Sequence, residues 1–347
     1  MIPIQNIYYM LSYAFTVLKE QEYKNIATEQ FANVADMCSA ILIKGVSVQI
    51  KRGLMREYIE RTESLSSLRG RMEISESIKK QTMIRKQLVC SYDEFSVNSY
   101  LNRIIKTTMI FLLQSKISAK RKKEIKKLLL YLSDVDTLDI HMINWNVRYD
   151  RNNQTYRMLI SICWLAVKGL LQTTSDGTVR LMDFLDERPM NKLYEKFILE
   201  YYRKEFPKLT VNSSRIDWAT DDGVIDMLPN MKSDVMISYE NTVLIIDAKY
   251  YSSTTQNYYD VKKFHSSNLY QIFAYVKNKD AEFGNTPHEV SGMLLYAKTD
   301  EEFHPKDYQI SGNKISVNVL DLNCDFEGIK SQLNDIVKNY FDDNAIS

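Results

Sequence analysis

The chain has 347 residues, of which 45% are hydrophobic and 26% are charged, a composition that is ordinary for a globular protein with room for two domains. Its four cysteines are far apart and form no C-x-x-C pair, which argues against a zinc site or disulfide framework and predicts a reducing, cytoplasmic location. No apolar run approaches the roughly 20 residues that span a bilayer, and the first residues lack the basic region of a signal peptide, so no membrane partner is expected.

The net charge of +1 conceals an asymmetry between the two halves. Residues 1–180 carry 27 Lys and Arg against 17 Asp and Glu, a net charge of +10, whereas residues 181–347 carry 18 against 27, a net charge of −9. A basic half suits a polyanion or an acidic partner surface, and an acidic half that approaches DNA needs a metal, a partner or local basic patches. Net charge alone does not choose between these possibilities.

The first half is predicted to be an α+β region made of helices and one small β-rich module. Apolar residues at helical spacing predict helices over residues 4–19, 30–44, 99–114, 118–132 and 157–171. Alternating residues at about 46–75 predict the β-rich module, with a protruding loop. Its arginines either lie on a solvated strand face or bind a partner; they are Arg52, Arg56, Arg61, Arg69 and Arg71.

The helix predicted over residues 118–132 carries six basic residues, which indicate a solvated face or a phosphate contact. Residues 172–177 are rich in turn formers and sparsely charged, and we predict the domain boundary there. The expected domains are therefore residues 1–177, helical at about 95–171, and residues 178–347.

In the second half, helices and strands succeed one another as in an α/β layered fold with a mixed central sheet. A helix over residues 190–206 ends at Pro207 and carries Glu195 and Glu200 near its apolar stripe. The remaining predicted elements are strands at 208–214, 290–296 and 314–320 and helices at 268–276 and 326–341.

Residues 231–251 predict two strands joined by a polar turn at Glu240 and Asn241. In the second strand, Asp247 and Lys249 share one face, at the end of an otherwise apolar run. If the strands pair as a hairpin, Asp234 lies beside Asp247. Buried charges are costly unless they are paired or bind a metal, and two close carboxylates favour a cation such as Mg²⁺. A structural Asp–Lys pair is the alternative interpretation.

The pattern Asp234…Asp247-Ala248-Lys249 resembles the active site of PD-(D/E)XK nucleases, although Ser233 replaces the proline that gives the motif its first letter. The resemblance implies that the two acids, with the Ala248 carbonyl, bind Mg²⁺ and that the lysine orients the attacking water. It also implies a helix glutamate facing the metal, for which Glu195 and Glu200 are rivals. Farther along the chain, Gln271 and Tyr275 resemble the Q-x-x-x-Y element of RecB-like nucleases, which lies next to the site.

Several motifs in order are similar to the McrC family, the nuclease subunits of McrBC 5-methylcytosine restriction systems. They lie at residues 2–14, 52–54, 70–71, 102–106, 193–197, 247–251 and 263–271. This resemblance implies a partner-docking region followed by a restriction-endonuclease-like domain that cleaves double-stranded DNA. The implied partner is a McrB-like hexameric AAA+ GTPase, whose GTP hydrolysis the subunit stimulates. The chain has no G-x-x-x-x-G-K-[ST] loop, so GTP would be bound by the partner.

By the same resemblance, Arg52, Arg61, Arg69 and Arg71 are candidate partner contacts, and His265 and Tyr275 are candidate DNA contacts. Gln271 would orient Lys249 or the DNA backbone. Two other functions stay open from the sequence. In the first, the chain is chiefly a GTPase-activating scaffold with a dispensable nuclease centre. In the second, it is a RecB-like nuclease that acts without a motor.

Overall fold

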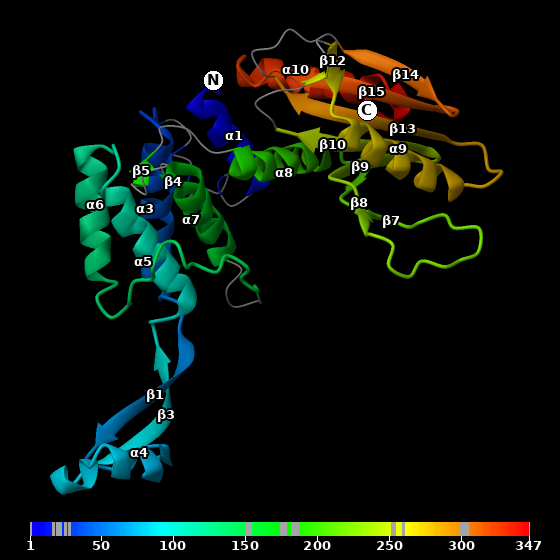
Figure 1. Ribbon diagram of the computed structural model, residues 1–347. Helices are drawn as coiled ribbons and strands as arrows, with labels where there is room; N and C mark the ends of the chain where they lie inside the picture. Colours follow the sequence, from blue (N-terminus) through cyan, green and yellow to red (C-terminus); the bar gives the residue numbers. More distant parts are fainter. Residues whose placement is uncertain are drawn as a thin grey trace. The chain divides into compact units, whose positions relative to one another are not determined.

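The computed structural model describes residues 2–15, 18, 23, 26, 29–149, 155–173, 179–181, 187–250, 255–258, 261–298 and 305–346. They form two compact units (Figure 1): one holds Met1–Phe31 and Leu185–Ser347, and the other holds Ala32–Phe184. The boundary predicted at residue 177 lies outside the described residues. In the part of the chain that is described, no helix is both long and apolar enough to cross a membrane.

The first 31 residues belong to the same compact unit as the carboxyl-terminal half, which differs from the predicted domain 1–177. Helix α1 (Ile4–Ala14) buries Tyr8, Met10 and Leu11 and packs against α8 (Glu187–Glu205). The amphipathic pattern identifies α1 as a helix with one apolar side. That pattern does not specify which distant helix covers this side.

The first unit is built on a mixed sheet with the strand order β14-β15-β13-β10-β9-β6. Strands β10, β13 and β15 are mutually parallel, and the other neighbours pair antiparallel. The mixed α/β architecture predicted for this half is therefore confirmed. The strands are β6 (Thr210–Asn212), β9 (Val235–Tyr239), β10 (Thr242–Lys249), β13 (Glu289–Ala297), β14 (Lys306–Ile310) and β15 (Asn313–Leu320).

Helix α9 (Ser266–Ala281) covers one face of this sheet and encloses an apolar core with Val243 and Ile245 of β10. Gly292 of β13 allows the close approach, because a β-carbon there would lie 2.6 Å from a methyl group of Val276. The alternate residue Leu244 is equally buried, so β10 is a central strand with no solvent-facing side. Helices α8 and α10 (Phe326–Lys338) also pack against the sheet, at β10 and β15.

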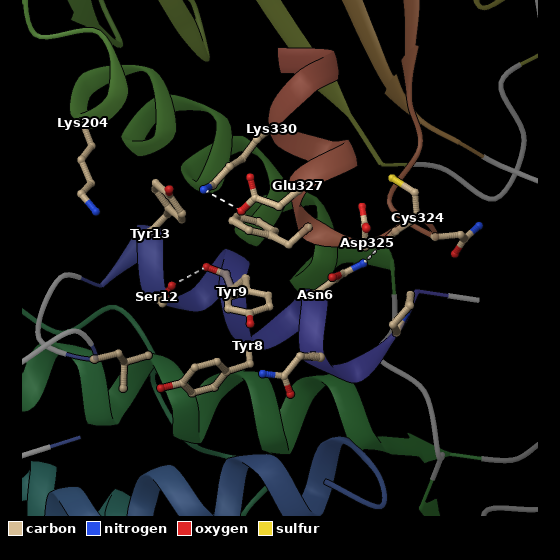
Figure 2. Close-up of a pocket in the computed structure, with 15 residues that line it drawn as sticks. Asn6, Tyr8, Tyr9, Ser12, Tyr13, Lys204, Cys324, Asp325, Glu327 and Lys330 are labelled. Atoms are coloured by element: carbon tan, nitrogen blue, oxygen red, sulfur yellow. Dashed lines mark hydrogen bonds and ion pairs between the residues drawn. The ribbon is translucent and has the colours of Figure 1, made fainter. Parts of the chain in front are cut away.

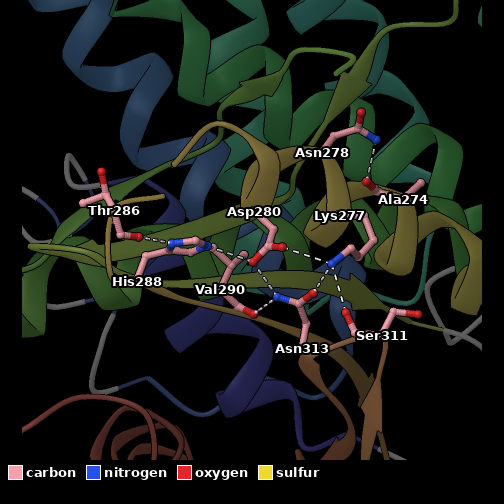
Figure 3. A network of polar contacts seen from close by, with 9 residues as sticks. All are labelled: Ala274, Lys277, Asn278, Asp280, Thr286, His288, Val290, Ser311 and Asn313. Atoms are coloured by element: carbon pink, nitrogen blue, oxygen red, sulfur yellow. Dashed lines mark hydrogen bonds and ion pairs between the residues drawn. The ribbon is translucent and has the colours of Figure 1, made fainter. Parts of the chain in front are cut away.

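A polar network fastens the carboxyl-terminal end of α9 to the sheet (Figure 3). Lys277 donates to Asp280 at 3.0 Å and to Asn313 Oδ1 at 2.7 Å. Asn313 in turn donates to Asp280 at 2.8 Å and to the Val290 carbonyl at 3.0 Å. Because every member has a partner, the network fixes the register between helix α9 and strands β13 and β15.

Four shorter strands form two ribbons beside the main sheet of this unit. Strand β7 (Arg215–Ile216) pairs with β8 (Met231–Lys232), and β11 (Thr255–Tyr258) pairs with β12 (Val261–Phe264). Helix α11 (Asp343–Ile346) follows α10 near the end of the chain.

The second unit contains a group of packed helices, which were all predicted, although α3 is longer than expected. Helix α3 runs through Gly45 to Arg52, so the strand expected at residues 47–51 is wrong. Val46 and Gln49 are buried at helical spacing there, and this packing outweighs the weak helix preference of one glycine. The helices are α3 (Val34–Arg52), α5 (Tyr100–Leu113), α6 (Ala119–Leu130) and α7 (Tyr156–Leu170).

Strands β1, β2 and β3 form a three-stranded sheet, with the order β1-β3-β2, as an arm that extends from these helices and carries α4 at its far end (Figure 1). The module therefore spans residues 57–96 rather than about 46–75, because β3, which pairs with both β1 and β2, lies beyond the predicted range. The arm consists of β1 (Glu57–Leu65), β2 (Arg71–Met72), α4 (Ile74–Lys79), the short 3₁₀ helix Thr82–Arg85 and β3 (Leu88–Ser96). Farther along, β4 (Leu171–Thr173) pairs with β5 (Val179–Leu181).

Candidate active site

Strands β9 and β10 form the predicted hairpin, with its turn at Glu240 and Asn241. The register places Ile246 opposite Val235, so the next residues of the two chains, one step farther from the turn, are Asp247 and Asp234. Asp234 accepts a hydrogen bond from the Ala248 backbone N–H at 3.0 Å. The two carboxylates therefore lie side by side at one edge of the sheet, as the sequence predicted for a hairpin.

Ser233 stands where the resembled motif has proline, and it fixes the chain just before Asp234. The side chain is buried, and its backbone N–H donates to the Ser214 carbonyl at 3.0 Å. Its own carbonyl accepts from the Ser213 hydroxyl at 2.7 Å. These bonds hold the approach to Asp234 by hydrogen bonding instead of by the fixed φ angle of a proline.

Asp247 and Lys249 form an ion pair at 2.8 Å, and their side chains are only 2% and 12% exposed. The second oxygen of Asp247, Oδ2, is buried, and no donor among the described residues reaches it. Burial, together with the neighbouring charge of Asp234, raises the pKa of Asp247 to about 7, although Lys249 lowers it. The pair thus leaves one buried oxygen available for a further positive group.

Helix α8 brings Glu195 to the two aspartates. Burial, together with the charges of Asp234 and Asp247, raises the pKa of Glu195 to about 7, although Lys249 lowers it. Glu195 and Asp234 line the same cavity, of about 340 Å³, whose wall also includes Lys192, Lys196 and Lys232. The cavity therefore combines an acidic centre with a lysine-rich rim.

Glu200, the rival glutamate, is engaged elsewhere. Its carboxylate pairs with Arg203 at 2.8 Å, one helical turn farther along α8. Five residues separate it from Glu195, which is about 140° around a helix. Of the two candidates, Glu195 is the one that the structure places among Asp234, Asp247 and Lys249.

The sequence analysis missed Asn191, one turn before Glu195 on α8. Its side-chain amide donates to Glu195 Oε1, and its oxygen accepts from the Tyr250 backbone N–H at 2.8 Å. Tyr250 directly follows Lys249, so this one side chain bridges the helix and the end of β10. The available signal was the i, i+4 spacing of Asn191 and Glu195, which places both on one face of the helix.

The predicted residues on α9 make different contacts from those expected. Gln271 donates to the Tyr275 hydroxyl at 2.9 Å, and the described residues show no hydrogen bond between Gln271 and Lys249. Tyr275 is 7% exposed and belongs to the core under α9. His265 is the residue that precedes the first turn of α9. The Gln271–Tyr275 pair therefore belongs to the packing of α9.

The four candidate arginines lie in the other unit, at or beyond the end of α3. Arg61 pairs with Glu94 and, at 3.4 Å, with Glu63. The remaining three occupy varied settings: Arg52 ends α3, Arg69 lies 3.9 Å above the Tyr92 ring, and Arg71 pairs with Glu73 at 3.3 Å.

Within the described ranges, no three His, Cys, Asp or Glu side chains are grouped closely enough to hold a metal ion by themselves. The candidate donors at the end of β10 are instead the two aspartates, Glu195 and, by the resemblance to the nuclease motif, the Ala248 carbonyl. Oxygen donors suit a hard cation such as Mg²⁺, which keeps several waters and needs only one or two protein carboxylates. The buried Asp247 Oδ2 without a donor is the feature of this set that fits a cation.

A larger cavity, of about 790 Å³, lies in the same unit between α1 and the start of α10 (Figure 2). The rings of Tyr9 and Phe326 stack there at 4.5 Å. Its two carboxylates already have partners, since Asp325 caps α10 through the Gly328 N–H and Glu327 pairs with Lys330 at 2.9 Å. This cavity lacks the perturbed acids of the β10 edge, so we place the candidate active site at the smaller one.

Comparison with known proteins gives the family of this chain. A family model described as "McrBC 5-methylcytosine restriction system component" matches residues 5–297. The chain belongs to this family. It is 30% identical, over 98% of its own length and 98% of the relative's, to "Type IV methyl-directed restriction enzyme EcoKMcrBC" of Escherichia coli strain K12.

Two solved structures from Thermococcus gammatolerans also resemble the chain more distantly. One is a half-complex of a tetradecameric assembly of McrB AAA+ hexamers with bound McrC. The match has 17% identity and a TM-score of 0.47, and it covers 95% of this chain and 76% of that chain. The other is the McrBC complex, with 20% identity, 58% of each chain covered and a TM-score of 0.39.

Proposed function

We propose that this chain is the Mg²⁺-dependent endonuclease subunit of a GTP-dependent restriction complex directed at DNA that contains 5-methylcytosine. Membership of the McrBC family supports the restriction system and the modified base. The observation that carries the nuclease is the buried Asp247–Lys249 pair with Asp234 and Glu195 beside it. Several charges buried together cost stability, and such clusters are typical of functional sites.

In this proposal the first unit has the PD-(D/E)XK nuclease fold. The mixed sheet, the acidic hairpin and the helix that supplies a glutamate support this assignment. Asp234, Asp247 and the Ala248 carbonyl would hold Mg²⁺, with Glu195 completing the metal or water shell. When bound there, Mg²⁺ would polarise the phosphate and lower the pKa of a coordinated water.

The side chains of this chain would do the remaining work. Lys249, held by Asp247, would position the attacking water and offset the negative charge that develops on the phosphate. Glu195, with a pKa of about 7, would accept a proton at neutral pH. We retain His265 as a proposed DNA contact at the start of α9. For Gln271 and Tyr275 we now propose a supporting role, since both are engaged with each other.

The second unit would dock onto an AAA+ GTPase partner and stimulate its GTP hydrolysis. The arm formed by β1, β3 and α4 supports this role, because it bears charged side chains and exposed apolar residues such as Ile78 and Ile84. Arg52, Arg61, Arg69 and Arg71 are its proposed contacts. Exposed apolar patches of this kind mark interaction sites.

The deciding experiment is DNA cleavage with Mg²⁺ by the purified chain, with and without the partner and GTP, using methylated and unmethylated DNA. Cutting of methylated DNA only by the full mixture, lost in Asp247→Ala, is the expected result. Cutting by the chain alone would instead indicate a nuclease that needs no motor. No cutting anywhere, with GTP hydrolysis still stimulated, would leave a scaffold and contradict the proposal.

A further inference from the structure

The bridge made by Asn191 joins two elements that supply the candidate active site. Helix α8 carries Glu195, and strand β10 carries Asp247 and Lys249. Asn191 donates to the Glu195 carboxylate and accepts from the N–H of Tyr250, the residue after Lys249. The packing of α8 against β10 also brings these two elements together.

The orientation of the Asn191 amide follows from its partners. A backbone N–H only donates, so the amide oxygen faces Tyr250. The NH₂ group must then face Glu195, whose carboxylate accepts. An exchange of the amide oxygen and nitrogen would place donor against donor and acceptor against acceptor. The amide of Asn191 therefore donates to Glu195 through its nitrogen and accepts from Tyr250 through its oxygen.

This arrangement opposes the forces that would drive Glu195 out of the site. Asp234 and Asp247 repel its charge, and burial disfavours it. The amide donor of Asn191 favours the ionised carboxylate and lowers its pKa. A glutamate side chain has several rotatable bonds, so without this donor it would gain freedom by turning away from the other acids.

We propose that Asn191 is a positioning residue of the nuclease centre, which holds the Glu195 carboxylate at a fixed place relative to the end of β10. This inference rests on the proposed function and adds a residue that supports its metal and water shell. Residues that orient ligands in this way typically change metal affinity about 10- to 100-fold when they are replaced.

The test uses the full chain and a double-mutant cycle. Mg²⁺ and, in parallel, Mn²⁺ are titrated by isothermal calorimetry into the wild type, Asn191→Ala, Glu195→Ala and the double variant, without DNA. We expect Asn191→Ala to weaken metal binding about 10-fold or more. In the Glu195→Ala background, it should change the affinity less than about twofold, because Asn191 acts through Glu195.

Asn334→Ala is the matched control. Asn334 accepts from the Tyr201 hydroxyl at 2.8 Å and so also ties α8 to a neighbouring element, but away from the carboxylates. A merely structural role for Asn191 predicts one of two results. Asn191→Ala weakens metal binding equally with and without Glu195, or it lowers the melting temperature and leaves the metal affinity unchanged. Either result would overturn the inference. If Asp247→Ala binds metal like the wild type, the proposed function itself fails; if only Asn191→Ala behaves like the wild type, the failure is confined to this inference.

Discussion

Strand β10 and the arm of the second unit both place acids next to bases, but in opposite surroundings. On β10, Asp247 and Lys249 are almost completely buried. On the arm, Arg61 pairs with Glu63 while both side chains are more than 40% exposed. Exposed ion pairs contribute little to the free energy of folding and lose little hydration, whereas buried ion pairs carry a large desolvation cost. The comparison shows that an i, i+2 pattern of opposite charges becomes informative only when burial is known.

The largest expected effect removes the buried pair. Asp247→Ala or Lys249→Ala should lower Mg²⁺-dependent DNA cleavage by the complex on the order of 10²–10³-fold or more, because each removes charge stabilisation at the reacting phosphate. Arg61→Ala, which breaks the exposed pair in the other unit, should leave the Mg²⁺ affinity of the β10 site unchanged. Circular dichroism checks that the variants fold; if both β10 variants unfold, the pair is structural instead.

The two glutamates of α8 extend the comparison along one helix. Glu195→Gln should slow cleavage about 10- to 100-fold, since its carboxylate belongs to the metal or water shell. Glu200→Gln, which breaks only the pair with Arg203, should stay within about twofold of the wild type. Initial rates at saturating Mg²⁺ distinguish them, and equal losses would remove the assignment of Glu195.

The pH dependence of cleavage follows from the same burial. Asp247 and Glu195 each have a pKa of about 7 without metal, so protons compete with the cation near neutrality. Cleavage at limiting Mg²⁺ should rise with pH, by about tenfold between pH 6 and pH 8 for a single ionising carboxyl. Saturating Mg²⁺ should shift the midpoint downwards. A flat profile over this range would contradict the proposed metal ligands.

On the arm, charge should matter for the partner and not for the chemistry. The Arg71 side chain is 81% exposed, and Arg71→Glu reverses its charge. We expect stimulation of the partner's GTP hydrolysis to fall by roughly fivefold, as is typical of a charged contact at the rim of an interface. Lys126→Glu on α6 makes the same change of charge in the same unit and serves as the control. Undiminished stimulation by Arg71→Glu would exclude Arg71 as a contact.

The smallest effect concerns stability at the far end of α9. Asn313→Ala removes one buried member of the network in Figure 3 and should lower the free energy of unfolding by about 1–3 kcal/mol. Urea unfolding at constant pH measures this change, and the exposed Asn323→Ala is its control. Equal stabilities would show that the network contributes nothing.

Hydrogen bonds to Thr286 and Asp280 raise the pKa of His288 in the same network. The stabilisation by its protonated ring is therefore fully present below the unfolded-state pKa and is lost as pH rises through the folded-state pKa. Removing this ring in His288→Gln should flatten that part of the stability profile.

The sequence by itself determined the local elements and the acidic residues of the β9–β10 hairpin. Helical periodicity identified α5, α6, α7 and α8, and alternation with the turn at Glu240 identified β9 and β10. The pairing of these strands then necessarily placed Asp234 beside Asp247, because register in a hairpin follows from its turn. The extension of α3 was not predicted, because tertiary packing keeps residues 47–51 helical. Local helix and strand preferences carry no information about that packing.

Tertiary structure alone decided which helices pack against which elements and which side chains meet. It placed α1 in the unit of the carboxyl-terminal half, chose Glu195 over Glu200, and bridged Glu195 to Tyr250 through Asn191. These outcomes depend on contacts between residues far apart in the chain. A local sequence pattern predicts the face of the helix or strand on which a side chain lies, but not the distant residue that it contacts. The buried Asp247 shows the physical reason most clearly, since its raised pKa comes first from the atoms that surround it and not from its place in the sequence.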